Sequence, residues 1–114
     1  MNNKEFALLA AKTLSDKKAT DIVAIEIGEK ASFADYLVIA TGNSERQVNA
    51  LIDDVEEAFA KKELLVKSIE GKQNSGWVLM DFGDIIVNIF TKEMREKYGI
   101  EKVWGDCDFL NIEE

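Results

Sequence analysis

Residues 76–90 read Gly-Trp-Val-Leu-Met-Asp-Phe-Gly-Asp-Ile-Ile-Val-Asn-Ile-Phe, and this stretch decides how the rest of the chain folds. Two runs of β-branched, aromatic and long apolar residues flank Gly83 and Asp84. This is typical of a β-hairpin, because Gly adopts positive φ and Asp bonds its own backbone in tight turns. The second run has Asn88 as its only polar side chain. A strand this apolar on both faces belongs inside a sheet that is covered on both sides.

The segments around this hairpin predict further helices and strands. Their order is helix, strand, strand, helix, strand, hairpin and short helix, over residues 3–17, 22–27, 36–41, 44–62, 64–70, 76–90 and 91–98. The second helix has the clearest signal, because apolar residues recur at helical spacing from Val48 to Phe59 behind a capping box at Ser44 and Gln47. Together the segments predict a single α+β domain, a mixed five-stranded sheet packed with helices.

Composition narrows the class of protein. The chain has 114 residues, of which 46% are hydrophobic, enough for one domain with one core. Its single cysteine, Cys107, excludes an internal disulfide and argues for a reducing compartment. The absence of histidine excludes a Ser-His or Cys-His dyad and argues against a structural zinc site. With no membrane-length apolar run and no signal-peptide pattern, we expect a soluble, cytoplasmic protein that does not engage the membrane.

The charge also points to a kind of partner. The net charge is −8, and half of it falls in residues 105–114, which hold four acidic side chains and no basic one. An acidic domain lacks the basic face that a nucleic-acid backbone requires, so we expect no direct nucleic-acid binding. It is suited to a basic protein surface, although the same charge could serve solubility alone.

Two stretches invite a chemical interpretation. Residues 42–46, Gly-Asn-Ser-Glu-Arg, join a buried strand to a helix, where free amides could hold a phosphate or simply carry an ordinary helix cap. The carboxylates nearest the buried strands are Glu26, Asp35, Asp81 and Asp84, and two of them close together could form a Mg²⁺ site, whereas Asp81 and Asp84 could serve only the hairpin turn. No nucleophile is paired with a base and no metal cage is evident, so we expect no catalytic residue, no cofactor and no metal.

Three large aromatic side chains lie near the ends of predicted elements: Trp77, Tyr98 and Trp104. Tryptophan and tyrosine are typical anchors of protein interfaces, although each is also common in cores. Glu101 and Asp106 lie near them in the sequence, and aromatic residues rimmed by charge suit partner binding.

An ordered set of short motifs resembles the Iojap family, the bacterial and organellar ribosomal silencing factors. The similarity runs from about Lys4 to Asp106, which places a silencing-factor domain at residues 1–106 and an acidic tail at 107–114. The family usually has a histidine where this chain has Asn88. The motifs lie at residues 21–22, 33–36, 41–48, 70–71, 76–84 and 103–106.

The resemblance implies a function that composition does not. Family members bind the large ribosomal subunit through the ribosomal protein numbered fourteen, on the face that meets the small subunit. They thereby block subunit joining and lower translation when nutrients are short, as in stationary phase. The resemblance also implies a nucleotidyltransferase-like core without catalytic residues, and homodimers off the ribosome.

The partner-binding residues expected on these grounds are Trp77, Asp81, Tyr98, Glu101, Trp104 and Asp106. The alternative function is that of a small nucleotide-binding or transferase-like domain that uses residues 42–46.

Overall fold

The predicted hairpin lies inside the sheet, with its second strand at the centre, in the computed structural model, which describes residues 1–71 and 75–112. β4 (Trp77–Asp81) and β5 (Ile85–Thr91) pair antiparallel. Gly83 lies between them with φ +96°, and its amide donates to Oδ1 of Asp81 at 2.7 Å. The turn chemistry expected of this stretch is therefore confirmed for Asp81.

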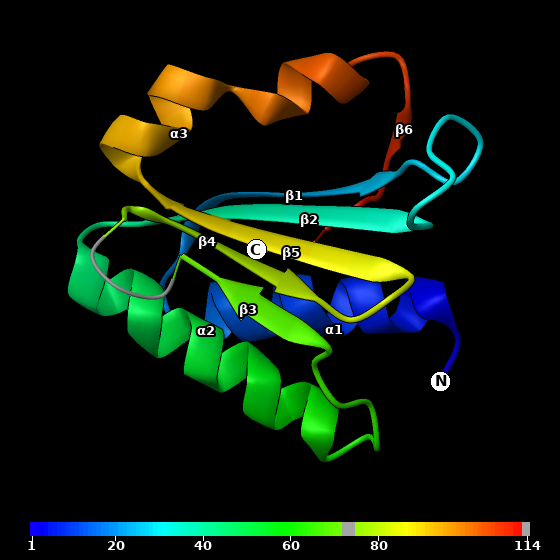
Figure 1. Ribbon diagram of the computed structural model, residues 1–114, viewed down its shortest axis with the longest axis horizontal. Helices are drawn as coiled ribbons and strands as arrows, with labels where there is room; N and C mark the ends of the chain where they lie inside the picture. The colour runs from blue at the N-terminus through cyan, green and yellow to red at the C-terminus, as the bar shows by residue number, and fades with distance from the viewer. Residues whose placement is uncertain (72–74, 113–114) are drawn as a thin grey trace.

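The sheet has six strands in the order β3-β4-β5-β2-β1-β6 (Figure 1). The four strands outside the hairpin are β1 (Thr20–Glu26), β2 (Tyr36–Gly42), β3 (Ser68–Glu70) and β6 (Asp108–Phe109). β2 and β5 are parallel and the other pairs are antiparallel, so the sheet is mixed, as predicted. β5 is buried from Ile85 to Phe90, which confirms its interior place.

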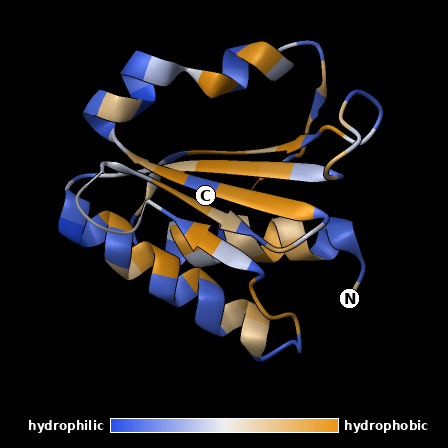
Figure 2. Cartoon of the chain, in the orientation of Figure 1, coloured by the Kyte–Doolittle hydropathy of each residue, from blue (hydrophilic) through white to orange (hydrophobic). Residues whose placement is uncertain are grey.

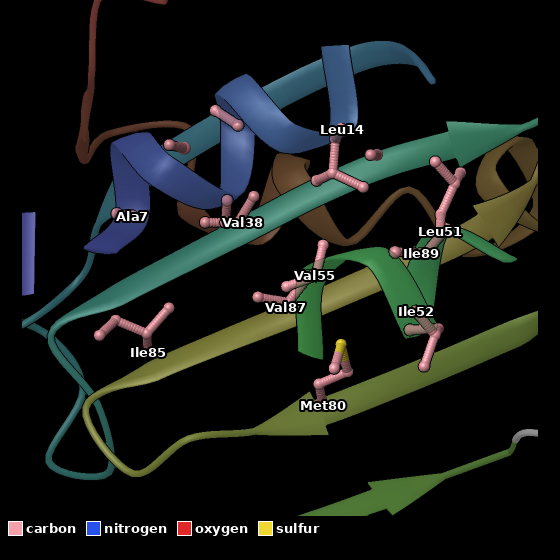
Figure 3. Packing of buried hydrophobic residues seen from close by; sticks show 14 of the residues in the cluster. Ala7, Leu14, Val38, Leu51, Ile52, Val55, Met80, Ile85, Val87 and Ile89 are labelled. Atoms are coloured by element: carbon pink, nitrogen blue, oxygen red, sulfur yellow. The ribbon is translucent and has the colours of Figure 1, made fainter. Parts of the chain in front are cut away.

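One face of the sheet is covered by α1 (Asn3–Asp16) and α2 (Glu45–Ala60). Each helix starts at a side-chain cap, Asn2 for α1 and Ser44 for α2. Figure 3 shows the contact between these helices and the sheet, where aliphatic side chains from both layers interdigitate. This layer holds the larger share of the buried apolar side chains.

The opposite face is covered by α3 (Lys92–Tyr98) and the 3₁₀ helix η1 (Ile100–Trp104), which we call the α3–η1 layer. None of its side chains is fully buried. Figure 2 shows why, because α3 is mostly hydrophilic while the strands beneath it are mostly hydrophobic. Thr91 caps α3 and Gly99, at φ +47°, ends it, as the sequence predicted.

The prediction from the sequence was wrong about two strands: it omitted one and made another too long. The expected sheet had five strands, and the sixth, β6, lies inside the predicted acidic tail. Its two residues have no strand pattern in the sequence, and they form a strand because they pair with β1. The amide of Leu110 also donates to the carbonyl of Ala24 at 2.7 Å. β3 covers only residues 68–70 of the predicted 64–70. Residues 113–114 of the tail and 72–74 before the hairpin lie outside the described part of the chain.

Candidate functional site

Two side chains of β5 contact the Trp77 ring and fix its position. Side chains alternate along a strand, and the β4–β5 register places Trp77 opposite Phe90 and Leu79 opposite Asn88, all toward the α3–η1 layer. The indole ring stacks on Phe90, with centroids 5.0 Å apart and planes 25° apart. Its Nε1 donates to Oδ1 of the buried Asn88 at 2.9 Å. These two contacts fix the plane and the direction of the ring.

α3 supplies the opposite wall. Met94 and Tyr98 are four residues apart, so they share one face of the helix. The Tyr98 ring lies over Trp77 with centroids 5.0 Å apart, and Met94 packs toward the same apolar cluster. Together they form an open depression of about 350 Å³, which we call the Trp77–Tyr98 groove. It is lined by Glu70, Gly71, Ser75, Trp77, Leu79, Met94 and Tyr98.

The groove suits a protein side chain rather than a reaction. Its walls are two aromatic rings, a thioether and a leucine, with the Glu70 carboxylate among the lining groups. Large, oriented aromatic rings beside a flexible methionine are typical of protein interfaces. Tyr98 leaves 45% of its surface exposed, so a partner could bury it further.

Of the six predicted site residues, Trp77 and Tyr98 line the groove and the other four do not. Glu101 is engaged inside the chain, where its Oε2 accepts from Nε of Arg95 at 2.6 Å. Trp104 lies at the end of η1, and its ring packs against that of Phe33 with centroids 6.2 Å apart. Asp81 is at the far end of β4, about 13 Å along the strand from Trp77.

Asp106, the last predicted residue, forms an exposed ion pair with Lys30. The hydrogen bond from the ammonium lowers the pKa of the Asp106 carboxyl below its usual value, and the same bond raises the pKa of Lys30. This pair ties the segment after η1 to the loop that follows β1.

Leu79 and Met94 line the groove and Asn88 bonds its Trp77 ring, but none of the three was among the expected site residues. A signal for the first two existed, since Leu79 follows Trp77 by two strand positions and Met94 precedes Tyr98 by one helical turn. Asn88 stood out as the only polar residue of its strand, but its bond to Trp77 depends on the hairpin register.

The alternative site at residues 42–46 is occupied by contacts within the chain. Ser44 Oγ accepts from the amide of Gln47, and the Gln47 side-chain oxygen accepts from the amide of Asn43. The neighbouring depression is lined by Glu45, Glu93 and Glu96 and by one basic residue, Lys92. The lining is net negative, so the local charge opposes nucleotide binding there.

Within residues 1–71 and 75–112, no group of three or more acidic or cysteine side chains is placed to hold a metal ion. Over the same residues, no helix has the length and apolar character needed to cross a bilayer.

Comparison with known proteins decides the family. The family described as "Ribosomal silencing factor during starvation" matches residues 1–114. A ribosomal silencing factor of Halalkalibacterium halodurans is 36% identical over 113 residues, which covers 99% of this chain and 97% of the relative. The chain belongs to the ribosomal silencing factor family. The resemblance drawn from its short motifs is confirmed.

Other ribosomal silencing factors and organellar relatives agree. The chloroplast protein Iojap of Zea mays is 34% identical over 107 residues, covering 94% of this chain and 46% of that protein. A Mus musculus relative named "Mitochondrial assembly of ribosomal large subunit protein 1" is 32% identical, covering 80% of this chain and 41% of its own length. A crystal structure of a Chromobacterium violaceum protein superposes with a TM-score of 0.88 at 33% identity, covering 92% of this chain and 88% of that one.

Proposed function

We propose that this chain represses translation by binding the large ribosomal subunit through the Trp77–Tyr98 groove. Membership of the ribosomal silencing factor family supports the ribosome as the target, and the name of the mouse relative supports the large subunit. The observation that carries the proposal is the pair of aromatic rings that the fold orients at the open side of a thinly covered sheet face.

The chemistry of the groove fits a basic protein partner. The ring of Tyr98 and the walls of Leu79 and Met94 offer apolar area that a partner can bury. The chain carries a net charge of −8, so a basic ribosomal protein would be attracted from a distance and ribosomal RNA repelled. The groove therefore selects protein over nucleic acid on the ribosome surface.

In this proposal the partner is the large-subunit protein numbered fourteen, on the face that the small subunit meets. Occupying that face blocks subunit joining and lowers translation under nutrient limitation. The chain acts in the cytoplasm by binding rather than by catalysis, and it forms homodimers when it is off the ribosome. Glu101 and Trp104 on η1, Asp106 just after η1 and Asp81 at the far end of β4 contribute outside the groove.

Sedimentation of purified ribosomal subunits tests the proposal. The wild-type chain should co-sediment with the large subunit alone and reduce the formation of joined ribosomes. Trp77→Ala and Tyr98→Ala should each weaken co-sedimentation by about tenfold or more, the usual scale for a buried aromatic anchor.

Leu65→Ala is the matched control, because Leu65 is 73% exposed in the segment between α2 and β3, away from the groove. It should bind and inhibit like the wild type. Binding to neither subunit would reject the proposed function, and unchanged binding by both aromatic variants, if folded, would reject the groove as its site.

A further inference from the structure

Arg95 connects four elements of the fold with one side chain. It lies in the middle of α3, and only 11% of its side chain is exposed. Its Nη1 donates to the carbonyl of Asp21 in β1 at 2.7 Å and to Oγ1 of Thr41 in β2 at 3.0 Å. Its Nε donates to Glu101 in η1 at 2.6 Å. The planar guanidinium has donors at the angles that such a set of acceptors requires.

The backbone of β1 is shaped to receive this side chain. The register between β1 and β2 is interrupted between Thr20 and Val23, and Asp21 has φ +49°. Aspartate is one of the few residues that tolerate this left-handed conformation. Because of this interruption, the Asp21 carbonyl is outside the regular β1–β2 hydrogen-bond ladder. It accepts a hydrogen bond from Arg95 instead.

The α3–η1 layer depends on this polar attachment because its apolar contacts are thin. Met94, Ile100 and Trp104 are half-buried against the sheet, and no residue of the layer is fully buried. By contrast, α1 buries five side chains on the other face. Few apolar contacts leave the rotation of a seven-residue helix loosely determined, so directed hydrogen bonds have a larger share in setting it.

That rotation decides the shape of the groove. Successive residues of a helix are turned by about 100°, so the direction of Arg95 sets the directions of Met94 and Tyr98. With Arg95 held against β1 and β2, Met94 and Tyr98 point at Trp77.

We propose that Arg95 is the positioning residue of the Trp77–Tyr98 groove. Its bonds to Asp21, Thr41 and Glu101 fix the α3–η1 layer in the rotation that closes Tyr98 over Trp77. Arg95 does not touch the partner and acts through Tyr98. As a statement about binding, the inference rests on the function proposed above; as a statement about the groove, it can be tested without the ribosome.

Glu101 makes the arrangement cooperative. Its Oε1 is buried and has no hydrogen-bond partner among the described residues, so within that part of the chain the carboxylate relies on Arg95. Removing the guanidinium leaves a half-buried charge unpaired, which is unfavourable until the carboxylate turns to solvent. Loss of Arg95 should therefore move η1 as well as α3.

The first measurement is the fluorescence of Trp77. The chain has two tryptophans, so in a Trp104→Phe background the emission comes from Trp77 alone. Arg95→Gln should shift this emission to longer wavelength and increase its quenching by acrylamide, because Tyr98 no longer covers the indole. Arg95→Lys should shift the emission in the same direction, because an ammonium keeps the positive charge but lacks the several planar N–H donors of the guanidinium.

Two further variants calibrate the result. Thr41→Val removes one acceptor at nearly constant shape and should give a smaller change of the same sign. Lys92→Gln removes one positive charge from an exposed position of α3 and should leave Trp77 emission unchanged. Circular dichroism selects the variants that remain folded, and Thr41→Val serves if both Arg95 variants unfold.

The second measurement is co-sedimentation with the large subunit. Arg95→Gln should weaken binding by about tenfold, equivalent to about 1.4 kcal/mol, and Lys92→Gln by much less. Unchanged Trp77 emission and quenching in the folded Arg95 variants would overturn the inference, whether or not binding is lost. If the wild type fails to bind, the proposed function falls, while the fluorescence still decides whether Arg95 positions the groove.

Discussion

The two faces of this sheet are built in different ways. On the α1–α2 face, Ile85, Val87 and Ile89 of β5 meet fully buried helix side chains. On the other face the same strand presents Ile86, Asn88 and Phe90 to a layer that buries none of its residues completely. One strand therefore serves a dense core on one side and a shallow, partly polar contact on the other. The first supplies stability, and the second leaves side chains available for binding.

The buried polar side chains sharpen this contrast. Thr41 and Asn88 are the two buried polar residues in the described part of the chain, and both lie under the α3–η1 layer. Asn88 accepts from Trp77, and Thr41 accepts from Arg95. Buried polar groups are costly unless paired, and here their partners are residues that shape or line the groove.

The largest effect is expected from Phe59→Ala on the α1–α2 face. Phe59 is fully buried, with ring centroids 5.1 Å from Phe6 and 4.4 Å from Phe82. Truncation should lower the free energy of unfolding by about 3–5 kcal/mol, the range for buried aromatic residues. Urea unfolding measures it, with Leu65→Ala as the exposed control. A loss near that of the control would mean that this face does not dominate stability.

Gly76→Ala should have a smaller effect that reaches both the backbone and the groove. Gly76 has φ +74°, and an added Cβ would lie 2.8 Å from Cγ of Met94. We expect a loss of about 1–3 kcal/mol from the backbone strain, together with a displaced Met94 and weaker subunit binding. Gly105→Ala is the control, because its φ is −60° and its nearest contact is 3.4 Å. Equal stability of the two variants would contradict the prediction.

Tyr98→Ala should separate binding from stability. The ring is nearly half exposed and contacts Trp77, so its loss should destabilise the fold by only about 0.5–1.5 kcal/mol. Binding to the large subunit should nevertheless fall about tenfold. Unfolding and co-sedimentation are measured on the same preparation. If Tyr98→Ala destabilises the chain as strongly as Phe59→Ala, the two faces contribute alike and the contrast is wrong.

The smallest effect concerns the Lys30–Asp106 pair. The folded pKa of Asp106 is lowered by the hydrogen bond from Lys30, so its contribution is present above the unfolded pKa of about 4 and disappears as pH falls through the lower folded value. The folded pKa of Lys30 is raised by the same hydrogen bond, so the stability that Lys30 contributes is lost only as the pH rises above about 10.5. Both groups are exposed, so Asp106→Asn should change the melting temperature at neutral pH only slightly. Thermal melts from acid to neutral pH should show a slightly weaker acid dependence for the variant, and a large change at neutral pH would contradict this.

Local patterns were sufficient wherever the chain interacts mainly with itself over short distances. The hairpin at Gly83, the cap at Ser44 and the stop at Gly99 were predicted because each depends on backbone conformation within a few residues. β6 was missed because Asp108 and Phe109 become a strand only by pairing with β1. The sites of Trp77 and Tyr98 were predicted from residue type, but their contact was not.

The sequence by itself determined the class of fold, the family, and the interior place of β5, because apolar periodicity and ordered motifs are properties of the chain. Only the tertiary structure decided which of the predicted residues lie together. It placed Tyr98 over Trp77, turned Glu101 toward Arg95, and left Asp81 at the other end of its strand. The physical reason is that strand register and helix rotation are set by contacts between segments far apart in sequence.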